Sequence, residues 1–208
     1  MLVPVSEASE KIHIYPYYYL NGLPCAENEC YLRKEVLEKL LEAAQLLPEG
    51  IFFVILDGWR SYETQLAIYE QTKSDLENEG FKGLELEQEL FKYVATPTKD
   101  ITRPSPHLSG GAVDLTIADQ HGWLPMGSEF DEFHERSQPD WFEKEVDLSL
   151  EETEFLNNRR LLKNVMLEVG FIPNADEWWH FEYGTKSWAQ EKGKQEYFKG
   201  ILYQEIER

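Results

Sequence analysis

Apolar residues recur along the chain with two periods, which predicts helices interspersed with strands. Residues 31–47 place their apolar side chains on one helical stripe, and Pro48 and Gly50 end this predicted helix. The continuous apolar run 51–56 that follows is typical of a buried strand. The first quarter of the chain therefore predicts a helix followed by a core strand.

The segment after this strand predicts a tight corner. Residues 57–61 have the composition of a turn, and Ser61 is a suitable N-cap for a second helix. Arg60 is therefore expected at a corner between a strand and a helix. A shorter helix is predicted around residues 85–95, whereas the three prolines of 96–109 argue against regular structure there.

Residues 111–118 alternate in a way that predicts another strand. Val113, Leu115 and Ile117 share one face of this strand, so Asp114 must point to the opposite face. The pattern therefore places a carboxylate on the side of the strand turned away from its aliphatic residues.

The second half of the chain combines a long polar segment with a well-delimited helix. Residues 119–148 are polar with scattered aromatic residues, and a loop of that length is expected to be functional, as a candidate lid. Ser149 and Glu152 form a capping box that opens a helix, and Gly170 ends it.

The last part of the chain predicts a strand and a helix. The aromatic-rich run 177–183 is typical of a strand, and a charged helix is predicted to end at Arg208. Because strands and helices mix without strict alternation, the expected fold class is α+β, with a small, mostly antiparallel sheet flanked by helices. The length of 208 residues predicts a single domain, residues 1–208.

The charge balance excludes nucleic acid as a partner. The chain has 39 acidic and 20 basic residues, a formal net charge of −19, and such a surface repels phosphates. No apolar run approaches the roughly 20 residues that span a bilayer, so no membrane partner is expected. The N-terminal residues lack a signal-peptide pattern, which predicts a cytoplasmic location. Cys25 and Cys30 are expected as free thiols.

Two histidines and one aspartate are candidate metal ligands. His107 lies in the irregular segment seven residues before Asp114, and His180 lies on the later strand. Two imidazoles and one carboxylate make a zinc site with an open fourth position, where a bound water ionises near neutral pH. Each residue alone is a weak signal, and their combination predicts one catalytic zinc ion per chain.

A glutamate close to a ligating histidine can act as the general base of such a site. Glu177 lies three residues before His180, but strict strand alternation puts the two on opposite faces. The assignment therefore requires a bend at Asp176 or Glu177, which the preceding turn-forming residues favour. Glu182 shares the His180 face and is the rival, with contact to solvent or a basic partner as its simpler interpretation.

The candidate ligands belong to longer motifs, S-x-H-x-x-G-x-A-x-D at 105–114 and E-x-W-H at 177–180. The corner 57–60 and the segment 126–131, Met-Gly-Ser-Glu-Phe-Asp, complete an ordered set. This set resembles the motifs of the zinc D-alanyl-D-alanine peptidases, and of the dipeptidases in particular, over about residues 12–185. Any single motif would not separate these dipeptidases from D,D-carboxypeptidases and phage endolysins.

The resemblance implies a role for each matching residue. It implies that His107, Asp114 and His180 are the zinc ligands and that Glu177 is the general base. It also implies that Arg60 is the cation that stabilises the tetrahedral intermediate, and that Ser105 and Asp131 hold the free ammonium group of the substrate.

Three features depart from the family pattern. Ser61 stands in place of a proline, Trp59 in place of a tyrosine, and the stretch between Asp114 and Asp131 is slightly shorter. None of them removes a catalytic group. A substrate-binding tyrosine is left unassigned among four candidates, Tyr15, Tyr17, Tyr18 and Tyr19.

The resulting hypothesis is a zinc-dependent dipeptidase that hydrolyses the small dipeptide D-alanyl-D-alanine to two D-alanines. One alternative is a D,D-carboxypeptidase acting on longer peptidoglycan precursors. A second is a catalytically inactive, zinc-containing module that binds cell-wall peptides.

Overall fold

A six-stranded sheet lies at the centre of the computed structural model, which describes residues 1–203. The strand order is β2-β4-β5-β8-β7, and β6 pairs with β5 outside this path. Only the β2–β4 pair is parallel among the described strand pairs, so the expected mostly antiparallel sheet is confirmed. The bounds are β2 Ile12–Ile14, β4 Phe52–Asp57, β5 Ala112–Asp119, β6 Gly122–Trp123, β7 Ile172–Pro173 and β8 His180–Glu182.

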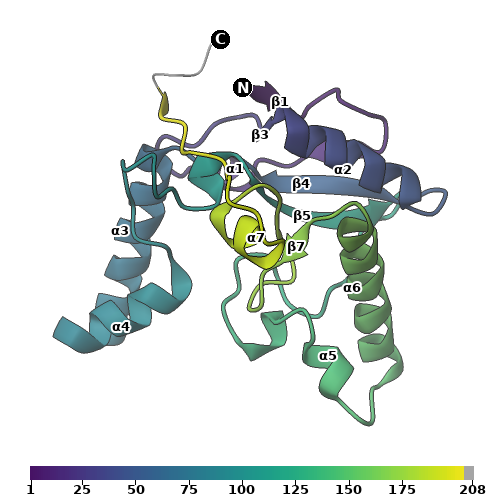
Figure 1. Cartoon of the computed structure of the whole chain (residues 1–208). Helices are drawn as coiled ribbons and strands as arrows, with labels where there is room; N and C mark the ends of the chain where they lie inside the picture. The colour runs from purple at the N-terminus through teal and green to yellow at the C-terminus, as the bar shows by residue number, and fades with distance from the viewer. Residues whose placement is uncertain (204–208) are drawn as a thin grey trace.

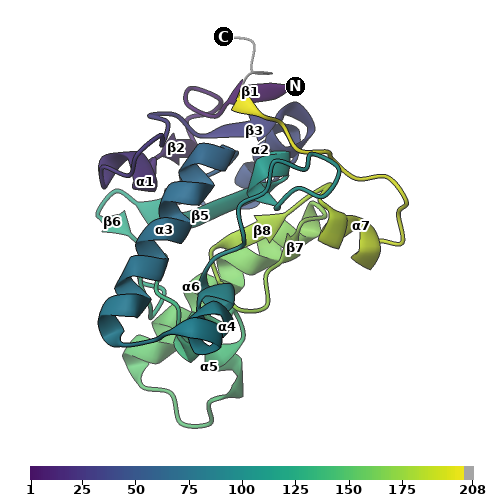
Figure 2. The same ribbon diagram turned by 90° about the vertical axis from the view of Figure 1, so that its left-hand side faces the viewer.

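Helices lie on both sides of this sheet. The long helices α2 (Lys34–Leu46) and α6 (Leu150–Glu168), seen on the right in Figure 1, contact each other. Figure 2 shows α3 (Tyr62–Glu79) in front of the sheet and α6 behind it, and α4 (Gly83–Tyr93) packs on α3. The shorter helices are α1 Tyr17–Leu20, α5 Trp141–Lys144 and α7 Lys186–Glu191.

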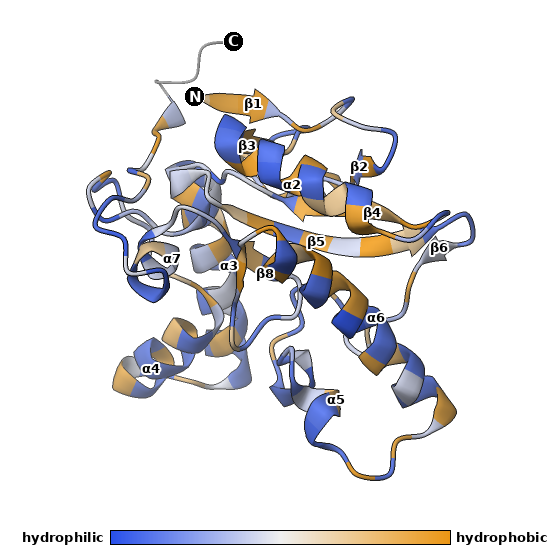
Figure 3. Ribbon diagram, turned by 45° about the vertical axis from the view of Figure 1, so that its right-hand side comes forward, coloured by the Kyte–Doolittle hydropathy of each residue, from blue (hydrophilic) through white to orange (hydrophobic). Residues whose placement is uncertain are grey.

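The hydrophobic core fills the space between the sheet and the α2–α6 pair. Val113, Leu115 and Ile117 are fully buried in one cluster with residues of these helices, including Leu40 and Met166. Figure 3 shows hydrophobic residues concentrated along β4 and β5. Burying each large aliphatic side chain contributes about 1.5–3 kcal/mol, which fixes the face of β5 that meets the core. The alternating pattern then turns Asp114 toward the opposite side, as predicted.

The predicted N-caps of two helices are confirmed, whereas the helix predicted over 31–47 is longer than the observed one. Ser61 accepts a hydrogen bond from Thr64 N at 3.0 Å, and Ser149 forms its capping box with Glu152. The helix predicted over 31–47 begins only at Lys34, because residues 31–33 form β3, which pairs with β1 (Leu2–Pro4).

The charged C-terminal helix predicted to end at Arg208 is wrong over its described part. Helix α7 ends at Glu191, and Gly193 then adopts a left-handed conformation with φ of 63°. The chain beyond it donates backbone hydrogen bonds to Gly184, Ile101 and Leu108, so tertiary contacts replace helical ones. Residues 204–208 lie outside the described residues.

Two other segments also differ from their predictions. Residues 119–148 are not a loop throughout, because they contain β6, α5 and a 3₁₀ turn at Glu135–Ser137. The strand predicted over 177–183 is confined to β8.

The membrane and cysteine predictions can be compared directly with the structure. Within residues 1–203 no helix is both long and apolar enough to cross a bilayer. Cys25 is exposed, Cys30 is buried, and both are free thiols. The cytoplasmic location stays a prediction.

Candidate metal centre and active site

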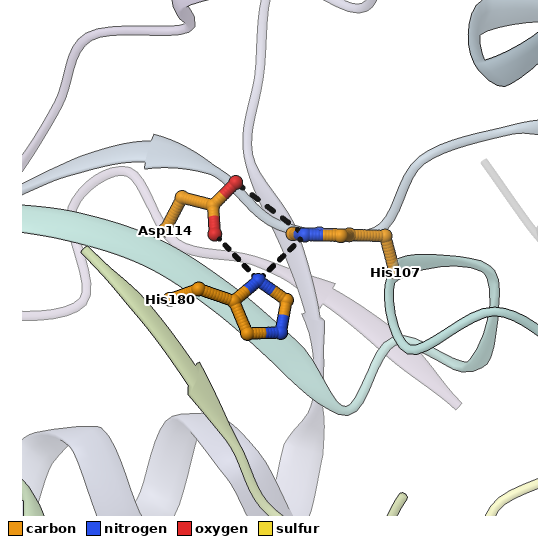
Figure 4. A group of neighbouring side chains, drawn as sticks. All are labelled: His107, Asp114 and His180. Atoms are coloured by element: carbon orange, nitrogen blue, oxygen red, sulfur yellow. Dashed lines mark hydrogen bonds and ion pairs between the residues drawn. The ribbon is translucent and has the colours of Figure 1, made fainter. Parts of the chain in front are cut away.

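Three buried side chains from three separate segments point toward one another (Figure 4). His107 lies on a 3₁₀ turn, Asp114 on β5 and His180 on β8, and the strand register places Asp114 directly beside His180. His180 Nδ1 lies 2.9 Å from Asp114 Oδ1, and His107 Nε2 lies 3.4 Å from Asp114 Oδ2. The two imidazole nitrogens are 3.2 Å apart. The structure thus brings together all three predicted ligands, within 4.8 Å of one another.

The strand-to-helix corner orients His107. Its Nδ1 donates to the carbonyl oxygen of Gly58 at 2.7 Å, which leaves Nε2 facing the cluster. Gly58 is required here, because a Cβ atom would collide with the carbonyl oxygen of Tyr31. The backbone N–H of Arg60 donates to the His107 carbonyl at 3.3 Å, so corner and ligand are tied together.

The charges of this cluster are strongly coupled. Burial alone would raise the pKa of Asp114, but the two imidazoles beside it lower that pKa well below its ordinary value. Burial works against protonation of His180, but hydrogen bonds to Asp114 and Glu182 raise its pKa. Two imidazole nitrogens and one carboxylate, converging in a buried place, match the donor set of a divalent transition metal such as zinc.

Glu177 reaches this cluster because the chain turns before β8. Residues 175 and 176 are bends, and His180 N donates to Glu177 O at 3.3 Å, so the required bend is present. Glu177 Oε2 lies 3.6 Å from His180 Nδ1 and accepts from Asn174 Nδ2 at 3.3 Å. Burial raises the pKa of Glu177, and His180 partly offsets this effect.

Arg60 is held by four side chains beside the ligands. Its guanidinium contacts Asp57 Oδ2 at 2.6 Å and Gln65 Oε1 at 3.0 Å. It lies 4.8 Å above the ring of Tyr18 and 3.7 Å from Asp114 Oδ2. Burial opposes its charge, but Tyr18, Asp57 and Asp114 raise the pKa of Arg60 above its ordinary value. The guanidinium is therefore a permanent, fixed cation at the cluster.

Asp131 and Ser105 each accept a hydrogen bond from a neighbouring group. Asp131 Oδ1 accepts from the Tyr18 hydroxyl at 3.2 Å, and burial raises the pKa of Asp131 to about 6 although Arg60 opposes this. Ser105 Oγ accepts from Leu108 N at 3.3 Å. Among the four candidate tyrosines, Tyr18 is the one placed beside Arg60 and Asp131.

A cavity of about 170 Å³ contains all seven predicted site residues on its walls. A neighbouring groove of about 620 Å³ runs along α3 and shares Tyr18, Asp131 and Phe133 with this cavity. The sequence did not single out Gln65 or Asn174. Asn174 belongs to the turn-forming run before Glu177, and that run could have indicated it as a site residue. No sequence feature indicated Gln65.

His13, His121 and His134 are exposed, and none of them lines the cavity. Trp178 and Trp179 are both buried, and Trp179 also lines the cavity. The aromatic pair thus serves the core and one wall of the site.

A buried cluster of metal-binding side chains with a carboxylate and a guanidinium beside it in one cavity defines the class of metal-dependent hydrolases. The chain belongs to the Peptidase_M15 family of metallopeptidases, described as D-ala-D-ala dipeptidase, whose family model matches residues 23–198.

Curated relatives carry the same description. The chain is 28% identical over 206 residues to the D-alanyl-D-alanine dipeptidase of Synechocystis sp., covering 90% of this chain and 83% of the relative. It is 33% identical over 157 residues to that of Escherichia coli, covering 74% and 66%, respectively. It is 30% identical over 155 residues to that of Enterococcus faecium, covering 71% and 70%.

Solved structures also match at lower similarity. One is the vancomycin resistance D,D-pentapeptidase VanY in complex with Zn(II), with 18% identity, a TM-score of 0.48 and coverage of 81% of this chain and 83% of that chain. Another is VanYB in complex with D-alanine-D-alanine, with 19% identity, a TM-score of 0.47 and coverage of 81% of both chains.

Proposed function

We propose that this protein hydrolyses D-alanyl-D-alanine to two D-alanines, using one zinc ion per chain held by His107, Asp114 and His180. The observation that carries the proposal is the convergence of these ligands with Glu177 and Arg60 on one small cavity. Membership of the D-ala-D-ala dipeptidase family supports the substrate. We also propose that residues 1–208 form one domain, supported by a core cluster that runs from Val5 to Phe181.

Glu177 is the general base and later the general acid of the proposed reaction. A bound zinc ion would supply a Lewis acid and would lower the pKa of water to near neutral. Glu177 Oε2 lies on the ligand side of His180, where it can take a proton from the attacking water and pass it to the leaving amine. Burial raises the pKa of Glu177, which improves its match to this task. Such proton transfer contributes about 10²–10⁴ in rate.

Arg60 stabilises the negative oxygen that develops on the substrate. Its position is fixed before substrate arrives, because Asp57 and Gln65 bind the guanidinium. A preorganised donor needs no rearrangement during the reaction, and removing one costs about 10²–10³ in turnover.

Asp131 and Ser105 bind the free ammonium group of the dipeptide. Asp131 supplies a carboxylate at the cavity wall and is positioned by the hydroxyl of Tyr18. The cavity of about 170 Å³ accommodates a short substrate, and a longer peptide would have to extend past Asp131.

The neighbouring groove favours one alternative, a D,D-carboxypeptidase acting on longer peptides. The groove borders the cavity at Asp131, so an N-terminal extension of the substrate could lie along α3. The inactive binding module receives less support, because Glu177 and Arg60 are both placed beside the candidate ligands.

The test compares D-alanyl-D-alanine with its N-acetyl derivative as substrates of the purified protein. We expect D-alanine release from the free dipeptide and little release from the acetylated one, which lacks the ammonium group. Faster release from the acetylated peptide would favour the carboxypeptidase. No release from either would reject both enzymes.

A further inference from the structure

Glu182 is a buried carboxylate that the proposed reaction does not use. It lies on β8 two residues after His180, and its side chain is 9% exposed. Its Oε1 lies 3.3 Å from His180 Nε2, and its Oε2 accepts a hydrogen bond from the hydroxyl of Thr185. Within residues 1–203 no lysine or arginine forms an ion pair with it, and its Oε1 faces the imidazole of His180.

The two glutamates near His180 face opposite nitrogens of its ring. Glu177 lies beside Nδ1, the nitrogen that also faces Asp114 and His107, whereas Glu182 lies beside Nε2 on the far side. This arrangement separates their roles. Glu177 can reach a molecule bound at the ligand cluster, and Glu182 acts on the imidazole itself.

We propose that Glu182 is a positioning residue of the metal site. Its carboxylate orients the imidazole of His180 and fixes the ring proton on Nε2. An imidazole whose Nε2–H is donated to a carboxylate presents the lone pair of Nδ1 to the cluster and is a stronger ligand. His107 has corresponding support at its Nδ1, which donates to the carbonyl oxygen of Gly58 at 2.7 Å and lies 3.4 Å from Asp57 Oδ2. Each candidate histidine ligand thus has an acceptor at the ring nitrogen that faces away from the cluster, and for His180 this acceptor is the Glu182 carboxylate.

Thr185 holds this carboxylate in place. Its hydroxyl oxygen accepts from Trp188 N at 3.1 Å as the N-cap of α7, so its single hydrogen is directed to Glu182. Thr185 is 2% exposed, which shields this hydrogen bond from water. The start of α7 and the candidate ligand His180 are thereby joined through two side chains.

The inference rests on the metal-binding part of the proposed function and is tested without substrate. Metal-free protein is titrated with Zn²⁺ in competition with a chromophoric chelator, which gives the dissociation constant. We expect Glu182→Gln to weaken zinc binding by about 10–100-fold. Thr185→Val should weaken it by a smaller factor, because the carboxylate remains but loses its anchor. Glu143→Gln, which removes an exposed carboxylate paired with Arg160, is the matched control and should leave affinity unchanged.

Affinity within twofold of the parent in folded Glu182→Gln would overturn the inference, whatever the protein hydrolyses. If that variant does not fold, Thr185→Val decides, and unchanged affinity there would overturn it equally. Failure of the parent protein to cleave D-alanyl-D-alanine would reject the proposed substrate and leave this result standing. Replacement of zinc by Co²⁺ adds a second readout, because altered coordination by His180 shifts the visible absorption of the cobalt protein.

Discussion

Asp131 adopts a backbone conformation that is uncommon for a residue with a side chain. Its φ is 64°, in the left-handed region, where aspartate is among the better tolerated residues. Such conformations persist where surrounding contacts impose them, and they cluster at functional sites. The conformation aims the carboxylate at Tyr18 and Arg60, beside the ligand cluster. Recognition of the substrate's amino end should therefore depend on the ionisation of Asp131.

This dependence predicts a pH effect on KM. Burial raises the pKa of Asp131 to about 6, so the carboxylate is ionised above that pH and becomes protonated as the pH falls through it. We expect KM for D-alanyl-D-alanine to rise below about pH 6 in steady-state assays, by roughly 10–100-fold at the limit for a lost charged hydrogen bond. In Asp131→Asn, KM should be high at every pH. A KM that stays constant between pH 5 and pH 8 in the parent protein would contradict this role.

Single residues differ in how far the sequence could predict them. The face of Asp114 followed from strand alternation, because burying Val113 and Leu115 leaves no other orientation. Glu177 required a bend that the turn-forming residues before it indicated. The hydrogen bond between Thr185 and Glu182 could not be predicted, since it depends on where Thr185 lies after the chain leaves β8.

At the scale of elements, α6 holds the segment that carries Asp131. Arg159 on α6 is 4% exposed and donates to the carbonyl oxygens of Met126 and Gln138, each at 2.7 Å. Burial lowers the pKa of Arg159 to about 10, so it stays protonated at neutral pH. Ser128, in the same segment, accepts from Trp178 Nε1 at 2.9 Å. The long segment is thus fixed to the turn that bears Glu177.

Replacing Arg159 should loosen this segment. In Arg159→Met two carbonyls lose their donor, at roughly 1–3 kcal/mol for each buried group left unpaired. We expect a lower free energy of unfolding in urea titrations, and a KM for the dipeptide that rises more than kcat falls. Arg160→Met is the matched control, because Arg160 is exposed and, within residues 1–203, forms an ion pair with Glu143 alone; it should cost at most about 1 kcal/mol. Equal stability of the two variants would contradict the role of Arg159.

Elements with strong local signals were predictable, and those set by distant contacts were not. Capping residues fixed the starts of α3 and α6, since these hydrogen bonds are local. Strands β3 and β7 have two or three residues each and exist through pairing with β1 and β8. The helix predicted to reach Arg208 ended early because backbone groups near residue 200 bond to residues 101 and 108.

At the scale of the whole molecule, the sheet separates the hydrophobic core from the candidate active site. One face meets α2 and α6 and holds the apolar core, while the candidate ligands Asp114 and His180 face the side covered by α3. The corner after β4 brings Arg60 and the support of His107 to the same place. The ordered motifs made this convergence predictable. The contact between Glu182 and His180 Nε2 could be recognised only from the structure.

Release of D-alanine during titration of metal-free protein with Zn²⁺ tests the central claim most directly. We expect no release without metal, and a rise that saturates at one equivalent of zinc per chain. Glu177→Gln should bind the same single equivalent but release D-alanine more slowly by about 10²–10⁴. Absence of release at every zinc concentration, or full activity of Glu177→Gln, would contradict the account.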